Sequence, residues 1–189
     1  HSFFMNRTEE FYRFYREKML FPSAAPNDAH LVLKKLQDVG KLRGIITQNI
    51  DNLHFKAGSK TVYELHGSVY RNYCQKCHKP YDLNYILNSS GIPKCSCGGI
   101  IKPDVVLYGE GLNQNTVTKS IEAISQADVL IVGGTSLNVY PAASFLEFFK
   151  GKHLILINKS KTSWDSSAEI AIDQNIGETF LKISQILSL

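Results

Sequence analysis

The feature that most constrains the fold of this 189-residue chain is the alternation of apolar runs with helical patterns in its second half. Residues 128–133 and 153–158 are of strand length and contain the continuous apolar runs 129–133 and 154–157, which are typical of strands buried on both faces of a sheet. A shorter run at 170–173 predicts a last strand. Helices are predicted at 117–127, 142–149 and 178–187. This alternation predicts an α/β fold with a parallel sheet covered by helices.

The first part of the chain predicts two helices and a strand. Thr8 is expected to cap a helix that carries a broad aromatic and aliphatic face as far as Leu20. Two prolines interrupt the chain, and a second helix is predicted from Asn27 to Gly40. Residues 44–47 predict a short buried strand that ends in polar residues.

The composition fits one globular domain with an ample core. Hydrophobic residues make up 43% of the chain and aromatic residues 11%, so disorder is not expected. The net charge of +4 is dispersed, which indicates a weak attraction for phosphates and no specific nucleic-acid partner. The sequence contains neither an apolar run of membrane-spanning length nor a signal peptide, so we expect no membrane partner and a cytoplasmic location.

All four cysteines lie in residues 70–102, a stretch that breaks the alternation of strands and helices. Two close pairs favour a tetrahedral zinc ion, with each pair forming one tight turn and Gly98-Gly99 allowing the second to close. Four thiolates leave no position open for water or substrate, so the expected zinc is structural. The alternatives are two disulfides or four unrelated thiols. Disulfides are disfavoured because the chain has no other cysteine and no secretory signal. The predicted ligands are Cys74, Cys77, Cys95 and Cys97.

Polar residues follow three of the predicted strands. In open parallel sheets, ligands bind beyond the carboxyl ends of the strands. Glycine at a strand end lets the backbone approach a phosphate or ribose closely, and hydroxyl side chains can contact it. Taken alone this is a weak signal, because many strands end in glycine and serine. The three segments are Gln48-Asn49-Ile50-Asp51, Gly134-Thr135-Ser136 and Asn158-Lys159-Ser160.

His66 is a candidate general base, because histidine titrates near neutrality. Taken alone, it is better explained as a buried histidine with a satisfied hydrogen bond. Asn49 and Asp51 stand at alternating positions, so both side chains can point the same way and read a carboxamide. The alternative for Asp51 is an ordinary helix cap before Leu53.

Taken together, these segments resemble the sirtuin family, the NAD-dependent protein lysine deacylases. The resemblance extends over nearly the whole chain, with its motifs in the family's order and spacing. It rests on Pro26-Asn27-x-x-His30, Thr47-Gln48-Asn49-Ile50-Asp51-x-Leu53-His54, Ala57-Gly58-Ser59, Glu64-Leu65-His66-Gly67, the four cysteines, Pro103-Asp104-Val105-Val106-x-Tyr108-Gly109-Glu110, Gly134-Thr135-Ser136-Leu137-x-Val139-x-Pro141-Ala142-Ala143 and Asn158.

The resemblance implies a role for each segment. His66 matches the catalytic base, Asn49 and Asp51 the nicotinamide pocket, and Gln48 a contact to the nicotinamide ribose, with Ile50 in the same cofactor segment. The remaining NAD contacts implied by the family are Gly134, Thr135, Ser136, Asn158, Lys159, Ser160 and Ile176. A substrate peptide would add as a strand between Val139 on one side and Val105, Val106, Gly109 and Glu110 on the other.

The resemblance also implies a reaction and a domain organisation. The acyl oxygen of the modified lysine attacks the nicotinamide ribose, nicotinamide leaves, and His66 takes a proton from a ribose hydroxyl that attacks the acyl carbon. Water then completes the reaction and gives free lysine and O-acyl-ADP-ribose, and zinc takes no part. A Rossmann-like NAD-binding domain is expected at residues 1–69 and 103–189, with a small zinc-binding module inserted at 70–102.

The sequence departs from the family pattern in two ways. It begins with His1 and contains neither the family's first strand with its Gly-Ala-Gly loop nor the Asp-Phe-Arg segment, so we expect an N-terminal portion to be absent from it. Without that portion, we expect weak NAD binding and no activity. Asn52 stands where the family usually has glycine, and asparagine tolerates the same left-handed backbone.

The resemblance also favours acetyl as the acyl group. Desuccinylating relatives carry a Tyr-x-x-Arg pair on the helix before Pro-Asn, where this chain has Tyr12 and Tyr15. A phenol cannot neutralise the carboxylate of a succinyl group. If both are simply core aromatics, the pocket equally lacks a cation. A one-residue gap in the correspondence would instead place Arg16 at the site.

Two other functions are alternatives. Mono-ADP-ribosyl transfer occurs among sirtuin relatives that often lack the histidine, so the presence of His66 favours deacylation. A zinc-ribbon binding module without catalysis belongs to a different class. Such a module would need a basic surface, whereas the only fixed positive charges in residues 74–97 are those of Lys76, Lys79 and Lys94.

Overall fold

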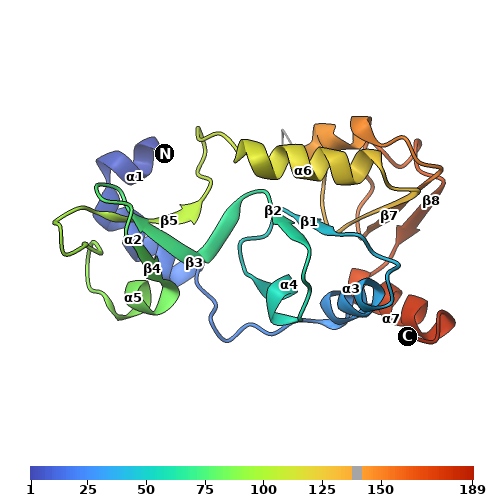
Figure 1. Ribbon diagram of the computed structural model, residues 1–189, viewed down its shortest axis with the longest axis horizontal. Helices are drawn as coiled ribbons and strands as arrows, with labels where there is room; N and C mark the ends of the chain where they lie inside the picture. Colours follow the sequence, from blue (N-terminus) through green and yellow to red (C-terminus); the bar gives the residue numbers. More distant parts are fainter. Residues whose placement is uncertain (138–141) are drawn as a thin grey trace. The chain divides into compact units, whose positions relative to one another are not determined.

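The computed structural model describes residues 1–137 and 142–189, and it divides into two compact units (Figure 1). The first unit comprises residues 1–24, 48–52 and 64–113. The second comprises residues 25–47, 53–63 and 114–189. The module predicted at residues 70–102 lies within the first unit.

The first unit is built on an antiparallel sheet in the order β4-β3-β5. Its central strand, β3, pairs Gly67 with Val105 at one end and Cys74 with Ile101 at the other. The register shifts between Ser68 and Asn72, which is a bulge in β3. The elements of this unit are α1 (Ser2–Asn6), α2 (Thr8–Lys18), β3 (Gly67–Cys74), β4 (Pro80–Asp82), α5 (Leu83–Asn88) and β5 (Ile101–Val105).

Aromatic side chains join α2 to this sheet. Phe4, Phe11 and Tyr12 pack edge to face, and Tyr15 stacks on Phe11 at 5.4 Å between ring centroids. The Tyr12 hydroxyl donates a hydrogen bond to the carbonyl of Ile101 on β5. The predicted aromatic face of α2 therefore forms the core of the first unit.

The prediction that Thr8 caps α2 is wrong. α1 ends only two residues earlier, at Asn6, and the Thr8 hydroxyl donates 2.7 Å to the carbonyl of Phe4 in that helix. Arg7 occupies the N-cap position and makes no capping bond with its side chain. The threonine therefore satisfies a carbonyl of the preceding helix instead of an amide of its own.

The second unit contains a parallel sheet in the order β6-β7-β8, with β7 paired in register to both neighbours. A two-stranded sheet joins β1 to β2. The elements are α3 (Asp28–Asp38), β1 (Ile45–Thr47), α4 (Leu53–Lys56), β2 (Val62–Glu64, whose last residue belongs to the first unit), α6 (Gln114–Ser125), β6 (Val129–Gly133), the 3₁₀ helix η1 (Ala142–Phe148), β7 (His153–Asn158), β8 (Ile170–Asp173) and α7 (Ile176–Ile186).

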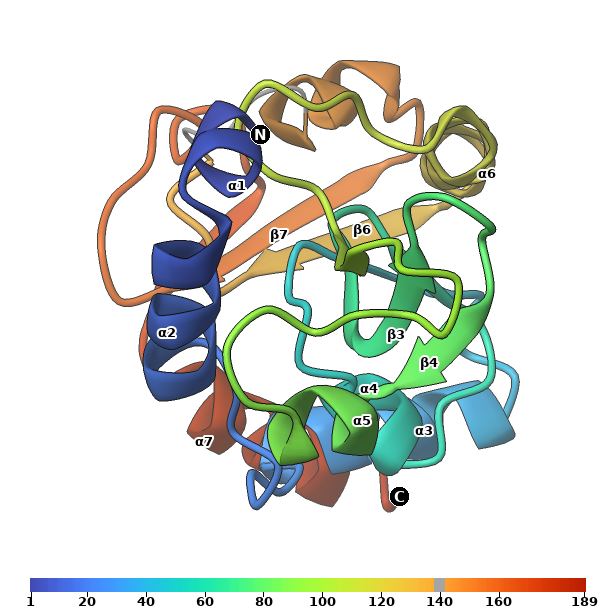
Figure 2. The same ribbon diagram turned by 90° about the vertical axis from the view of Figure 1, so that its left-hand side faces the viewer.

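Helices cover both faces of the parallel sheet, as the alternation in the sequence predicts. Figure 2 shows α3 and α7 on one side of β6 and β7 and α6 on the other. Ile157 of β7 packs with Val32 and Phe180 on the first side, whereas Leu154 and Leu156 belong to a second cluster that contains Leu146 of η1. Alternate residues of β7 thus serve two cores.

Two expectations for this unit need correction. β6 is not fully buried, since Val129 is 47% and Ile131 37% exposed. The physical reason is that β6 is an edge strand of the β6-β7-β8 sheet, so its apolar run is covered less than that of the central strand β7. The helix expected at 142–149 is a 3₁₀ helix, η1.

Among residues 1–137 and 142–189, no helix has the length and apolar character that crossing a membrane requires.

Candidate active site

His66 lies in the tight turn between β2 and β3, and its ring is held in one tautomer. Its Nδ1 lies 2.9 Å from the backbone carbonyl of Gln48. A carbonyl oxygen can only accept, so Nδ1 carries the hydrogen and Nε2 presents its lone pair. The backbone of the turn is held as well, since the amide of Val106 donates 3.0 Å to the His66 carbonyl. The arrangement suits a general base at Nε2.

Gly67 permits an unusually close approach of β3 to β5 beside this histidine. Its φ is +76°, and a Cβ added there would lie 1.9 Å from the carbonyl oxygen of Asp104. Only glycine fits this combination of backbone angle and space. The turn that carries His66 is therefore adjacent to residues 105–110, the segment predicted to bind a substrate peptide.

The segment from Gln48 to Asp51 belongs to the same unit as His66. In addition to the Gln48 contact, the carbonyl of Ile50 accepts a 3.1 Å hydrogen bond from the amide of Val69 on β3, and the Ile50 side chain packs against the aromatic core. Asn49 is exposed and Asp51 half-buried. The left-handed backbone expected at Asn52 is confirmed by its φ of 62°.

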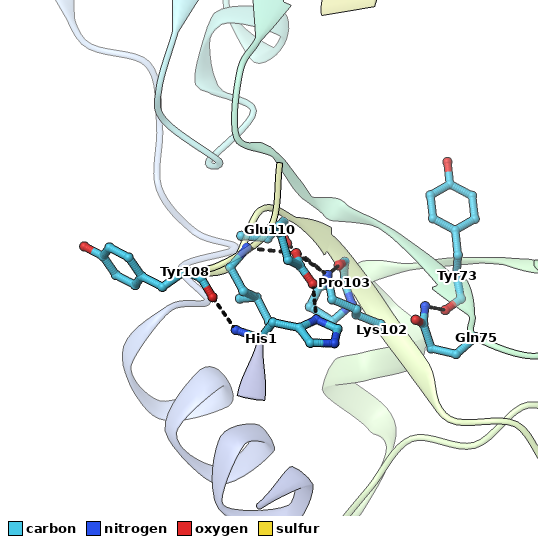
Figure 3. Close-up of polar contacts among 9 residues, drawn as sticks. His1, Tyr73, Gln75, Lys102, Pro103, Tyr108 and Glu110 are labelled. Atoms are coloured by element: carbon cyan, nitrogen blue, oxygen red, sulfur yellow. Dashed lines mark hydrogen bonds and ion pairs between the residues drawn. The ribbon is translucent and has the colours of Figure 1, made fainter. Parts of the chain in front are cut away.

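The predicted substrate segment is shaped by Glu110. The Lys102 ammonium donates 3.0 Å to Oε2 of Glu110 (Figure 3), and the amide of Leu107 donates 2.9 Å to the same oxygen. Lys102 also donates 3.1 Å to the carbonyl of Val105. Val105 is buried in the core, whereas Val106 is half-buried and Gly109 is exposed.

Val139, predicted to line the other side of the peptide, lies outside the described residues.

In the second unit, the side chain of Asn158 braces the loop after β6. Its Oδ1 accepts a 2.9 Å hydrogen bond from the amide of Thr135, and Gly134 turns the chain with a φ of +66°. The Nδ2 of Asn158 is buried and has no hydrogen-bond partner in the described part of the chain. A buried donor without an acceptor is costly, so this atom suits an acceptor on a bound ligand.

The other predicted cofactor contacts lie around the same sheet end. Ile176 begins α7 and packs so closely on Gly133 that an added Cβ there would lie 2.4 Å from its Cδ1. Ser136, Lys159 and Ser160 are exposed. The predicted cofactor residues thus fall into two sets, one in each unit.

The four cysteines form a single cluster of possible metal ligands. Their sulfur atoms all lie within 4.8 Å of one another. The separations of 3.4 to 3.6 Å measured within the cluster are too long for a disulfide, in which the sulfurs are about 2.05 Å apart. Four thiolates about 2.3 Å from one zinc stand about 3.8 Å apart, so the cluster fits a tetrahedral zinc ion.

The surroundings of the thiols favour a bound cation. The backbone amide of Cys97 and then the Tyr81 hydroxyl donate to Cys95 and lower the pKa of its thiol to about 5. At Cys77 the amide of Lys79 acts in the same direction, but the neighbouring thiols, Cys97 first, raise its pKa to about 12. Crowded thiols oppose one another's ionisation until a metal ion neutralises them.

Glycine is also required at this site. A Cβ on Gly99 would lie 2.6 Å from the sulfur of Cys74, and Gly98 has a φ of +80°. The expected role of the two glycines in closing the second turn is confirmed.

Sequence reasoning missed two charged residues, Lys102 and Arg71. Lys102 shapes the substrate segment, as described above. Arg71 contacts Glu64 and Asp104, which flank the His66 turn and the substrate segment. The Arg71–Asp104 contact spans 33 positions in the sequence, and no local pattern indicates a pairing of that kind.

Known proteins match this chain closely. The Sir2 family model matches residues 1–141. A Clostridium acetobutylicum protein named NAD-dependent protein deacetylase is 59% identical over 180 residues, which are 94% of this chain and 74% of that protein. A Clostridium perfringens protein of the same name is 57% identical over 185 residues, 97% of this chain and 76% of that protein.

Solved structures agree with these matches. One described as Sir2 with a p53 peptide and NAD+ has a TM-score of 0.93 at 39% identity. The match covers 99% of this chain and 81% of that structure's chain. Another, described as Sir2 bound to acetylated peptide, has a TM-score of 0.94 at 39% identity. The match covers 99% of this chain and 82% of that structure's chain. The predicted fold class, an α/β fold with a zinc-binding cysteine cluster, is confirmed.

Proposed function

The chain belongs to the Sir2 family, and from this premise we propose that it is an NAD-dependent protein lysine deacetylase. It removes acyl groups from protein lysines, with acetyl the preferred group, and releases nicotinamide and O-acyl-ADP-ribose. The names of its relatives and the Sir2 structures with acetylated peptide and NAD support this activity. The observation that carries it is the hydrogen bond that orients His66, because it leaves Nε2 ready to take a proton.

His66 acts as the base in this proposal. When Nε2 takes up a proton, the ring becomes an imidazolium and its Nδ1–H donates more strongly. The Gln48 carbonyl, already 2.9 Å away, stabilises that charged form without rearrangement. NAD supplies the ribose that accepts the acyl group and the nicotinamide that leaves.

The NAD contacts in this proposal are those that the family resemblance implies. Gln48, Asn49, Ile50 and Asp51 receive the nicotinamide and its ribose, with Asn49 and Asp51 reading the carboxamide. Gly134, Thr135 and Ser136 approach the phosphate and adenine ribose. The adenosine contacts are Asn158, Lys159, Ser160 and Ile176. The buried Nδ2 of Asn158 supports this assignment, because a ligand acceptor would satisfy it.

Zinc is structural in this enzyme. Cys74, Cys77, Cys95 and Cys97 close its coordination and leave no position for substrate. We propose that the module at residues 70–102 is inserted into a Rossmann-like domain formed by residues 1–69 and 103–189.

The partner is an acylated lysine of a protein substrate. We propose that the peptide adds as a strand to Val105, Val106, Gly109 and Glu110, so that backbone hydrogen bonds supply affinity with little sequence demand. The dispersed charge supports our proposal that neither a specific nucleic acid nor a membrane is a partner. We propose a cytoplasmic location, because thiols that bind zinc persist in a reducing compartment.

The test is product analysis. Purified full-length protein is incubated with NAD and an acetyl-lysine peptide, and all products are identified by mass spectrometry. Deacetylation predicts equal amounts of nicotinamide, O-acetyl-ADP-ribose and free-lysine peptide. ADP-ribose attached to protein would indicate mono-ADP-ribosyl transfer instead, and a binding module would release no nicotinamide.

A further inference from the structure

Arg71 bridges two carboxylates that lie on either side of the candidate catalytic turn. Its Nη1 donates 2.7 Å to Oε2 of Glu64, and its Nε donates 2.8 Å to Oδ2 of Asp104. The Glu64 side chain is only 8% exposed, whereas those of Arg71 and Asp104 are 41% and 42% exposed. One guanidinium therefore holds a buried and a half-exposed carboxylate at the same time.

Both carboxylates belong to segments that the proposed reaction uses. Glu64 ends β2 and stands two residues before His66. Asp104 lies on β5, pairs with Ser68 and directly precedes Val105. Arg71 thus connects the approach to the base with the start of the substrate segment.

The bulge in β3 allows one side chain to reach both segments. Ser68 pairs with Asp104, and the next pair is Asn72 with Pro103, so residues 69–71 are extra on β3. Arg71 is the last of these extra residues, and its side chain returns to Asp104. Bulges re-aim side chains in this way and recur beside active sites.

An ordinary ion pair on the surface contributes little to stability, but the contacts of Arg71 differ from such a pair in two respects. Removing one partner of a buried charge leaves the other uncompensated, which is far more costly than losing an exposed pair. The planar guanidinium also donates in two fixed directions, which the point charge of a lysine does not reproduce.

We propose that Arg71 is a positioning residue for deacetylation, which fixes the His66 turn relative to the segment that receives the acyl-lysine. This inference rests on the proposed function. It predicts that loss of Arg71 impairs the proton transfer at His66 more than the earlier departure of nicotinamide, because only the later step needs the base.

The experiment compares Arg71→Met, Arg71→Lys and wild type, each as the full-length protein, at saturating NAD and acetyl-peptide. Deacetylation and the exchange of labelled nicotinamide into NAD are both measured, with the Tm of each protein. A displacement of about 1 Å costs about 100-fold in rate, so we expect Arg71→Met to lower the deacetylation kcat about 10- to 100-fold. The nicotinamide exchange rate should fall less than about 3-fold, which is small beside the roughly 100-fold that such a displacement costs. Arg71→Lys should recover only part of the lost deacetylation rate.

Arg13→Met is the matched control, because Arg13 is an exposed arginine of the same unit on α2. It should leave both rates unchanged. Asp104→Asn serves if Arg71→Met does not fold, because it leaves the Glu64 contact in place. It should lower the ratio of deacetylation to exchange in the same direction by a smaller factor.

Equal losses of deacetylation and exchange, or wild-type rates in Arg71→Met or Asp104→Asn, would overturn the inference. Wild-type protein that neither exchanges nicotinamide nor deacetylates would instead overturn the proposed function, and the wild-type arm shows this directly.

Discussion

At the scale of single residues, function depends on backbone contacts more than on residue type. His66 is suited to act as a base because the carbonyl of Gln48 holds its Nδ1–H. The turn that carries it requires glycine at position 67, because a Cβ added there would lie 1.9 Å from the backbone oxygen of Asp104. Asn158 is placed by a similar contact: its Oδ1 accepts from the amide of Thr135, and its Nδ2 is buried without a hydrogen-bond partner among the described residues.

The two ends of the Asn158 amide can be tested separately. Asn158→Asp keeps an oxygen for the Thr135 amide but replaces the Nδ2 donor with an acceptor, whereas Asn158→Ala removes both. We expect Asn158→Asp to weaken NAD binding about 10-fold, the size of one hydrogen bond lost at a buried partner, with a Tm near wild type. Asn158→Ala should weaken binding at least as much and also lower the Tm. Wild-type NAD affinity for both variants, measured by calorimetry, would show that Nδ2 does not face the cofactor.

At the scale of elements, β3 joins the candidate catalytic turn to the zinc site. The strand begins at Gly67, directly after His66, and ends at Cys74, a predicted zinc ligand. Its partner β5 runs alongside from Ile101 to Val105, where the substrate segment begins. A structural zinc ion can therefore influence activity through the strand without touching the substrate.

The zinc site gives a prediction at this scale. We expect about one zinc per chain by metal analysis, the stoichiometry of a closed four-thiolate site. Cys74→Ala and Cys97→Ala should yield aggregated or inactive protein, because the binding free energy of such a site is folding free energy. Ser96→Ala, which lies between two of the ligands, is the control and should retain zinc and activity. Fully folded, active wild-type protein without zinc would contradict this account.

Helix α2 gives a second prediction, on acyl preference. Tyr12 and Tyr15 are 0% and 2% exposed in the aromatic core, and burial raises the pKa of both phenols, so they stay neutral. Arg16 donates to the Ile86 carbonyl and the Ser89 hydroxyl and lies over the Tyr12 ring. A succinyl carboxylate would gain no cation from these three residues.

We therefore expect kcat/KM for an acetyl-lysine peptide to exceed that for the matched succinyl-lysine peptide at least about 10-fold, which corresponds to about 1.4 kcal/mol. A propionyl-lysine peptide, neutral but longer, separates charge from size. Succinyl-lysine turned over as fast as acetyl-lysine would show that a cation reaches the acyl group.

At the scale of the whole molecule, patterns of local sequence predicted the second unit better than the first. The apolar runs at β6 and β7 predicted the parallel sheet, because a strand buried in a sheet needs continuous apolar residues. They could not predict that Val129 is 47% exposed, since a strand's position in its sheet depends on pairing between distant segments. The strands β3, β4 and β5 were not predicted. Arg71 and Asn72 interrupt the alternation of apolar and polar residues in β3, and a bulge shifts its register with β5.

The candidate site was predictable to a similar degree. The cysteine spacing pointed to zinc from local sequence alone, and the structure brings the four sulfurs together. His66 was identified through a family resemblance, whereas its orientation by Gln48 came only from the structure. Contacts between charged side chains distant in sequence, such as Arg71 with Asp104 and Lys102 with Glu110, leave no local pattern.

The central claim is that His66 is the base of an NAD-dependent deacetylation, and His66→Ala tests it most directly. Deacetylation of an acetyl-lysine peptide is measured in wild type and variant, with Tm and zinc content confirming that both are folded. His153→Ala, which removes an exposed histidine paired with Glu169, is the control. Losing a general base costs about 100- to 10,000-fold, so we predict a loss of that size for His66→Ala and none for His153→Ala. A folded, zinc-loaded His66→Ala protein that deacetylates at the wild-type rate would contradict the account.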